Sequence, residues 1–251
     1  MKTLIGISIF LATIALARIV QAQILETNPA AGPLAATNVP AADSGPLLPL
    51  VEMHDVPITA AIANLARQLD INYIIDPKLF ASTDASGRAL AEPEVSFRLQ
   101  NVSAREVLTR MLNLRNLVLR EDPVTRVARI TRINHPTPVV DASLLGMDTN
   151  NPVLATNEII PLIQFSDVPL DTALENLIRQ SQVEVRLDSR ITGASHPPDS
   201  RFVPAPLVFI RWENISAKQT IVALCQNYDL IIVKDAATGG LRIEPNPRVK
   251  K

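Results

Sequence analysis

The sequence predicts an α+β fold made of two tandem small domains, each a two-layer unit with the element order βαββαββ. The first observation is a repeated phrase, DVPITAAIANLARQ at residues 55–68 and DVPLDTALENLIRQ at residues 167–180. The second is a later pair of matching segments, RLQNVSAREVL at residues 98–108 and RWENISAKQTI at residues 211–221. The pairs occur in the same order at shifts of 112 and 113 residues, which indicates a tandem duplication.

The amino-terminal segment has the layout of a secretory signal peptide. Lys2 is followed by an apolar run of 14 residues (Leu4–Ala17) and then by a small-residue pattern that ends at Ala22. Such a run is shorter than the roughly 20 residues that a bilayer-spanning helix needs. We expect residues 1–22 to be cleaved off after Ala22, which would leave the mature chain in the periplasm. An uncleaved anchor is the alternative, and Arg18 keeps it open.

Two segments lack any apolar period and are predicted to lie outside the domains. Residues 23–49 are rich in alanine and proline, and they bury too little to offset their ordering entropy, so we expect a disordered lead. Residues 134–158 contain three prolines and are predicted to form a linker or an extended crossover. The first domain is therefore expected at 50–133 and the second at 159–247.

Each domain is predicted to open with a short strand, around residues 50–54 and 159–165, followed by a helix. Pro57 and Pro169 suit the first helical turn, where an N–H would be unpaired anyway. The preceding aspartates, two residues earlier, are expected to accept free N–H groups at the helix start. Apolar residues recur at three- and four-residue steps along one stripe of each helix: Ile58, Ala61, Ile62, Leu65, Ala66 and Leu69 in the first copy, and Leu170, Ala173, Leu174, Leu177 and Ile178 in the second.

The remaining elements are expected in one order in both copies. A strand that ends in aspartate (residues 71–76 and 183–188) leads through a polar loop to a second strand. The next helix is predicted to begin with a capping box in each copy, formed by a serine and the residue three positions later. These pairs are Ser103 with Glu106 and Ser216 with Gln219. A hairpin closes each copy.

Composition and motifs argue against several classes of function. The formal net charge of -1 gives no general attraction to nucleic acid. The three histidines lie far apart, and no pair has metal-ligand spacing on one helix. The sequence carries no phosphate loop, dinucleotide fingerprint or hydrolase nucleophile motif. We therefore expect no enzyme activity, no metal and no cofactor, with a hydrolase of envelope substrates as the alternative. Cys225 aligns with Leu112 and is expected to be a buried hydrophobe.

Five residues are candidates for an interaction surface: Asn64, Arg67, Asn176, Arg179 and Phe209. The first four repeat at equivalent positions on the first helix of each copy, and a solvated polar face is the alternative interpretation. Phe209 should point away from the core because its neighbours in LVFIRW alternate inward, and Ser96 occupies its position in the first copy. An exposed aromatic side chain can anchor a partner, whereas burial in the sheet is the alternative.

Both copies resemble the short amino-terminal domain shared by secretins and TonB-dependent receptors (STN-like). The resemblance rests on DVPITAAIANLARQLDINYIID with VSFRLQNVSAREVLTRMLNLRNLVLR, and on the matching segments of the second copy. It covers about residues 50–132 and 159–245, with no pore or barrel domain expected beyond them. It implies a periplasmic docking module whose partners are envelope proteins, such as a secretin-type or inner-membrane assembly component, and not nucleic acid. A self-assembling structural envelope protein, a homo-oligomer, is the alternative.

Overall fold

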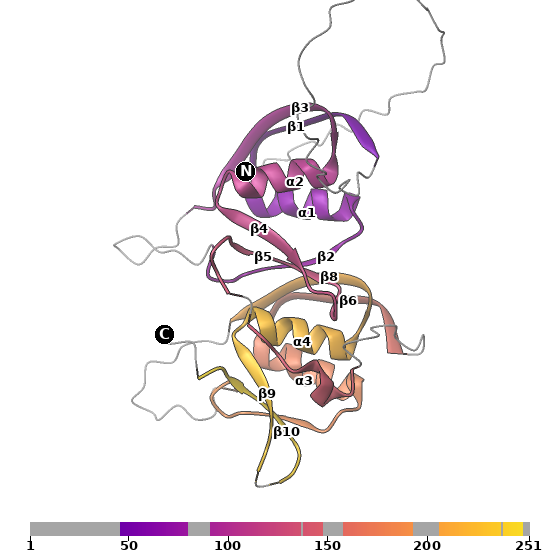
Figure 1. The fold of residues 1–251 in the computed structure, drawn as a ribbon, viewed down its shortest axis with the longest axis vertical. Helices are drawn as coiled ribbons and strands as arrows, with labels where there is room; N and C mark the ends of the chain where they lie inside the picture. The colour runs from indigo at the N-terminus through magenta and orange to yellow at the C-terminus, as the bar shows by residue number, and fades with distance from the viewer. Residues whose placement is uncertain are drawn as a thin grey trace, which may run out of the picture. The chain divides into compact units, whose positions relative to one another are not determined.

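The computed structural model describes residues 46–79, 91–136, 138–147, 158–192, 206–236 and 238–247. The predicted signal peptide (residues 1–22), most of the predicted lead and parts of the predicted linker lie outside the described residues. The chain combines helices with several small sheets (Figure 1), which confirms the α+β class. Residues Asp43–Lys251 form one compact unit that contains both copies of the repeat.

The first copy contains seven elements: β1 (Leu47–Pro57), α1 (Ile58–Gln68), β2 (Asn72–Ile75), β3 (Glu94–Ser103), α2 (Ala104–Asn113), β4 (Leu117–Glu121) and β5 (Val127–Arg132). The predicted disordered lead at 23–49 is wrong at its end, because β1 already begins at Leu47. Leu47 pairs with Ser103 of β3, so the ladder between β1 and β3 extends three residues before the predicted strand start at residue 50.

The second copy contains the same elements in the same order: β6 (Ile159–Pro169), α3 (Leu170–Ser181), β7 (Val185–Leu187), β8 (Leu207–Ser216), α4 (Ala217–Asn227), β9 (Leu230–Lys234) and β10 (Leu241–Pro245). The backbones also agree at their unusual positions, where φ is positive, a conformation that costs free energy for residues other than glycine. These positions pair at the shifts of the sequence repeat: Asp55 with Asp167, Asp70 with Gln182, Asn101 with Asn214, Asn116 with Asp229, and Arg126 with Gly239.

Each copy has three layers rather than the two that the sequence predicts. The strands divide into a two-stranded ribbon (β1–β3 or β6–β8) and a three-stranded sheet (β2-β5-β4 or β7-β10-β9), and the helix pair lies between them (Figure 1). In the first copy, Leu65 of α1 and Leu108 of α2 share one core with Val51 of the ribbon and Ile130 of the sheet. The helices bury apolar side chains toward both sheets, so a second layer of strands is needed to cover them.

The aspartates of the two DVP phrases do not cap the helices as predicted. Asp55 and Asp167 adopt positive φ angles in a β-bulge, just before helices that begin at Ile58 and Leu170. The first helical N–H groups bond instead to a distant backbone, since the N–H groups of Ile58 and Leu170 each donate over 2.9 Å to the carbonyl of a proline before β3 or β8. The phrase therefore marks a bulge and a helix start whose first N–H group is satisfied by the residue just before β3 or β8.

The second helices differ in their capping. A complete capping box is present in the second copy, where Ser216 and Gln219 bond reciprocally. In the first copy Ser103 accepts from the N–H of Glu106, but the Glu106 carboxylate pairs with Arg110 over 2.6 Å instead of returning to the cap. The prediction of two capping boxes is thus wrong for the first copy, because an arginine one turn along competes for the carboxylate.

Candidate interaction surfaces

The two copies meet at an interface, here called the junction, that is part of the core. Ile74 of β2 and Val127 of β5 belong to the same buried cluster as Trp212, Val222 and Leu224 of the second copy. The three-stranded sheet of the first copy therefore covers apolar surface on the second. Because the apolar cluster is continuous across the junction, we expect the two copies to move as one body.

The predicted linker contributes to this core. Ala142–Leu145 form a short 3-10 helix (η1), and Asp141 accepts hydrogen bonds from the N–H and hydroxyl of Ser143. Val140 and Met147, with Leu145, are buried in the cluster of the second copy. Where it is described, the segment is thus packed rather than extended, since its apolar residues reach a core that local sequence periodicity does not reveal.

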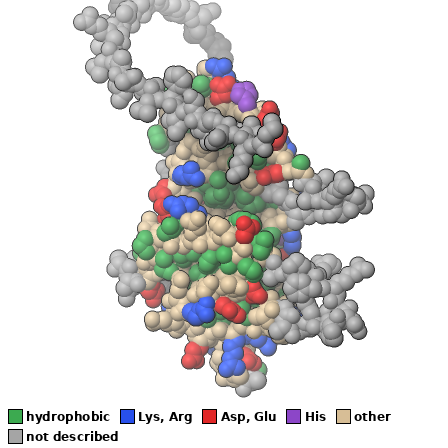
Figure 2. All heavy atoms as spheres, turned by 180° about the vertical axis from the view of Figure 1, so that it is seen from behind, with side chains coloured by type: hydrophobic (Ala, Val, Ile, Leu, Met, Phe, Trp, Pro, Cys, Tyr) green, Lys and Arg blue, Asp and Glu red, His purple; other side chains and the backbone are tan. Residues whose placement is uncertain are grey.

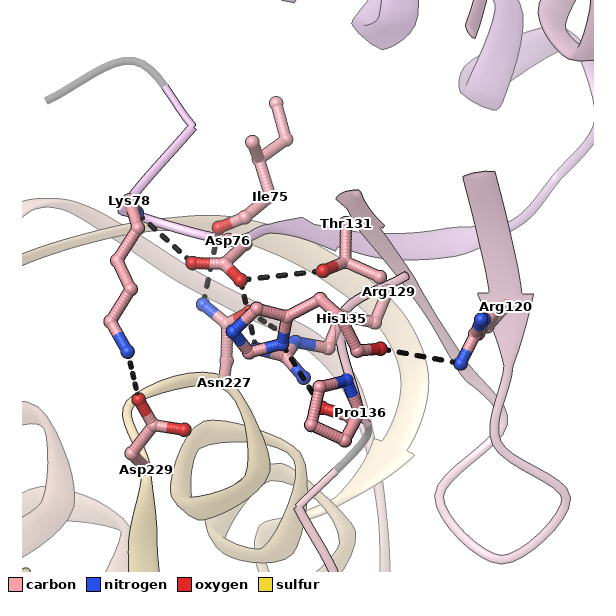
Figure 3. Close-up of polar contacts among 10 residues, drawn as sticks. All are labelled: Ile75, Asp76, Lys78, Arg120, Arg129, Thr131, His135, Pro136, Asn227 and Asp229. Atoms are coloured by element: carbon pink, nitrogen blue, oxygen red, sulfur yellow. Dashed lines mark hydrogen bonds and ion pairs between the residues drawn. The ribbon is translucent and has the colours of Figure 1, made fainter. Parts of the chain in front are cut away.

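A buried polar group ties the copies together at the junction (Figure 3). Arg129 is 6% exposed, and its Nη2 donates to Asp76 over 3.1 Å. Its Nε donates to the amide oxygen of Asn227 over 3.1 Å, while the amide nitrogen of Asn227 donates to the carbonyl of Ile75 over 3.1 Å. Burial lowers the pKa of Arg129, and the neighbouring Asp76 carboxylate opposes that effect. Asn227 therefore satisfies one polar atom of β5 and one of β2.

Edge strand β2 is also covered by the second copy. The indole Nε1 of Trp212 donates to the carbonyl of Tyr73 over 2.6 Å. The side-chain amide of Asn72 bonds to both the N–H and the carbonyl of Glu213, each over 2.8 Å, as a strand neighbour would. These bonds occupy backbone groups at the edges of β2 and β8, so neither is free for strand addition at this place.

Helix α4 supplies the remaining polar contacts of the junction. The amide of Gln219 donates to the carbonyl of Val124 over 3.1 Å, and that of Gln226 donates to Asp122 over 2.9 Å. Lys78 pairs with Asp229, the residue two positions after the helix. Together with Asn227, these residues fix the first copy to one face of α4.

Phe209 lies on the solvent side of β8, as predicted. Its side chain is 61% exposed, whereas Val208 and Ile210 on either side are buried. Leu207, two residues earlier on the same face of the strand, is 46% exposed, and Leu162 of the neighbouring β6 is 43% exposed. Figure 2 shows hydrophobic side chains gathered in a band across the middle of the molecule, the level at which β6 and β8 lie in Figure 1.

The first copy uses the position of Phe209 in a different way. There the hydroxyl of Ser96 accepts from the N–H of Asp55 over 2.9 Å and donates to its carboxylate over 2.9 Å, which holds the bulge. In the second copy Phe209 lies opposite the bulge that contains Asp167, and a phenyl ring supplies neither bond. The substitution exchanges a local brace for exposed apolar area.

The structure does not join the other four candidates into one surface with Phe209. Asn64 accepts a hydrogen bond from Gln68 over 2.8 Å on α1, and Asn176 contacts Arg179 on α3. Arg67 instead lines a cavity of about 170 Å³ at the junction, together with residues of β2 and β8. The repeated positions thus face different surroundings in the two copies.

A larger cavity of about 670 Å³ lies in the first copy, lined by residues that include Ile58, Pro93, Arg115 and Arg132. Arg115 donates to the carbonyl of Glu94 over 2.7 Å. Its equivalent in the second copy is Tyr228, whose hydroxyl donates to the carbonyl of Leu207 over 3.0 Å. Burial raises the pKa of Tyr228 to about 12, so this phenol stays protonated as a donor.

The outer sheet of the second copy carries a network of charged side chains. Arg190 bonds to Asp188 through Nε over 2.9 Å and Nη2 over 3.1 Å, and Arg242 bonds to Glu244 over 2.8 Å. The hydrogen bonds from Arg190 hold the pKa of Asp188 at about 2, below its ordinary value of 3.8. These four residues occupy the positions of Asp76, Lys78, Arg129 and Thr131 in the first copy, so the same place in the fold carries the buried Arg129–Asp76 pair once and a partly exposed network of ion pairs once.

Within the described ranges, no three His, Cys, Asp or Glu side chains are grouped so that they could hold a metal ion. No described helix is both long enough and apolar enough to cross a bilayer. Cys225 is buried, as predicted, and burial raises the pKa of its thiol to about 12. Trp212 is also buried, but its polar contact with the first copy was not anticipated.

Comparison with known proteins adds no family to these observations. The chain matches no protein-family model and no curated protein.

Proposed function

We propose that the chain is an exported, non-enzymatic protein-interaction module of the cell envelope, built from two tandem STN-like βαββαββ domains. Its role would be similar to that of the periplasmic docking domains of secretins and TonB-dependent receptors. Support comes from the resemblance of both copies to that family and from an α+β fold that repeats the same backbone features at the same spacing. The partner is an envelope protein, such as a secretin-type or inner-membrane assembly component.

The observation that carries the proposal is the exposed pair Phe209 and Leu207 on β8 (61% and 46% exposed). Aromatic anchors supply a large part of the binding free energy in protein interfaces. They are most effective on rigid elements, and β8 is held on one side by the ladder with β6 and on the other by the bond between Trp212 and Tyr73. The second copy thus presents an apolar anchor where the first copy has a polar brace.

The test places a photo-cross-linking side chain at position 209 in cells that express the full chain. Position 96 is the matched control, because it occupies the same place in the first copy. We expect one discrete cross-linked envelope protein from position 209 and not from position 96. Equal cross-linking from both positions, or none from position 209, would contradict the proposal.

A second measurement uses Phe209→Ser, which gives the second copy the residue that the first copy has. The variant should fold, because a serine hydroxyl can brace Asp167 as Ser96 braces Asp55 over 2.9 Å. Loss of an aromatic anchor costs about 2 kcal/mol or more, so affinity for the cross-linked partner should fall by about 30-fold. A variant that folds and keeps full affinity would exclude Phe209 as the anchor.

A further inference from the structure

The sheet that docks the first copy onto the second has an equivalent without such a neighbour. Sheet β2-β5-β4 covers part of α4 and β8, and sheet β7-β10-β9 occupies the same place in the second copy. The carbonyls of Tyr73 and Ile75, which accept side-chain donors at the junction, correspond to those of Val185 and Leu187 on edge strand β7. The second sheet therefore repeats the backbone of a surface that is known, within this chain, to dock a domain.

One polar atom on this sheet lacks the partner that its counterpart has. Arg242 corresponds to Arg129, whose Nε donates to Asn227 across the junction. In the described part of the chain, Nε of Arg242 is buried and has no hydrogen-bond partner. The Oδ2 atom of Asp188 lies 4.0 Å from this Nε, at the limit of an ion pair and beyond hydrogen-bonding distance. The Arg242 side chain is 40% exposed, but its buried Nε–H has no acceptor, which costs free energy. An acceptor placed as Asn227 is placed would remove that cost.

We propose that the outer face of sheet β7-β10-β9 docks a second protein whose helix end presents a neutral amide to Nε of Arg242, as α4 presents Asn227 to Arg129. The inference rests on the proposed function and adds a second surface, separate from Phe209, with a defined partner chemistry. Two ion pairs on this face join Arg190 to Asp188 and Arg242 to Glu244. Arg186 is exposed at the place of Ile74, which lines a cavity at the junction, so a partner that docks in the same way leaves room for this side chain. A partner with neutral amides and apolar groups can therefore meet this face without breaking an ion pair.

A second copy of this chain does not fit the surface. The residue of the first copy that corresponds to Asn227 is Leu114, which is 84% exposed and offers no acceptor. At the junction, Ile74 and Ala223 line one small cavity. In a head-to-tail stack of two chains, Arg186 of one chain would take the place of Ile74, and Arg110 of the next chain would take the place of Ala223. Two like charges would then lie at close range. The ends of the repeat pair thus disfavour continued stacking, as capping units do in repeat proteins.

The experiment grafts the acceptor face of α4 onto the first copy. Thr109→Val, Arg110→Ala and Leu114→Asn reproduce the α4 residues at two exposed positions of α2 and at the exposed residue just after its end, so the fold should be kept. Arg242→Ala in the same chain removes the donor from the variant's own outer sheet, so that the variant cannot stack on itself. Mixed with the natural chain in sedimentation-velocity runs, this fourfold variant should form a one-to-one complex, while the natural chain alone stays monomeric.

The controls decide what the complex means. A natural chain that carries Arg242→Ala should bind the fourfold variant at least about 10-fold more weakly, because it lacks the charged donor. Absence of a complex at millimolar concentration would overturn the proposal, and so would a complex that Arg242→Ala does not weaken. Self-association of the natural chain that Arg242→Ala abolishes would show that the occupant is a second copy, which also overturns it. Phe209 takes no part in these runs, so their failure is distinct from failed cross-linking at position 209.

Discussion

The buried contact of Asn227 gives the sharpest test of the junction. Asn227→Leu introduces the residue that the first copy has at the equivalent position, with the same number of side-chain heavy atoms and the same branching. It removes the acceptor for Nε of Arg129 and the donor for the carbonyl of Ile75, each at 3.1 Å. Arg129 is only 6% exposed, so water cannot readily replace the lost acceptor. The charged guanidinium would then remain buried with one donor more unpaired.

The magnitude follows from the two bonds. A hydrogen bond to a charged group contributes about 1.5–3 kcal/mol, and a neutral one about 1 kcal/mol. We therefore expect the free energy of unfolding to fall by about 3 kcal/mol. In urea, with a slope of about 2 kcal/mol per molar, the midpoint should fall by about 1.5 M.

Urea unfolding followed by circular dichroism measures this change. The matched control is Leu114→Asn, the reverse exchange at the equivalent and 84% exposed site, which should alter the free energy of unfolding by less than about 0.5 kcal/mol. The natural chain should unfold in one transition because the apolar core is continuous across the junction. If Asn227→Leu costs no more than its control, the junction contributes little to stability and the account of a single rigid body is wrong.

Two further predictions address the caps and the charged network. Gln219→Ala should lower the free energy of unfolding by about 2 kcal/mol, because this side chain closes the cap of Ser216 and also bonds to Val124 across the junction, each over 3.1 Å. Glu106→Ala, at the matched and only half-buried site, should cost less than about 0.5 kcal/mol in the same urea assay. Asp188→Asn should destabilise the chain at neutral pH, because the folded pKa of about 2 lies below the ordinary value of 3.8. That stabilisation is fully present above about pH 4 and is lost as the pH falls through 2, so the urea midpoints of the natural chain and the variant should converge there, and a gap that persists at pH 2 would contradict it.

Apolar spacing predicted the α+β class and the positions of α1 and α3, and the capping residues located the starts of α2 and α4. Helices α1, α2 and α3 each bury a stripe at three- and four-residue steps, and this signal is local. The number of layers was not predictable in the same way, because the division of strands between ribbon and sheet depends on pairings such as that of β1 with β3 across an intervening helix and strand. The role of Asp55 was missed for the same reason, since its partner Ser96 is 41 residues away.

The candidate surface was predicted in part. The alternation in LVFIRW correctly predicted that Phe209 is exposed, because a strand with one buried face reveals its outward positions. The repeated positions Asn64 and Asn176 were a weaker guide, since sharing a place in the sequence repeat does not give two residues the same neighbours. The junction residues Arg129 and Asn227 were not identified at all, because no local pattern shows that a polar residue will be buried against a different domain.

A comparison of the copies nevertheless contained a signal for the junction. Helix α2 is apolar on one face only, whereas α4 buries five consecutive residues from Ile221 to Cys225, and a helix that is apolar on most of its surface must be covered on most sides. The sheet that covers it shows the reciprocal change, since Ile74 is buried where the second copy has the exposed Arg186. A duplicated fold keeps the backbone of both copies nearly the same, so a change from apolar to charged at one position indicates a change of neighbour. Arg242 is an exception to this pattern. The second copy keeps the arginine of the docking sheet, but no described residue accepts a hydrogen bond from its Nε as Asn227 does from Arg129.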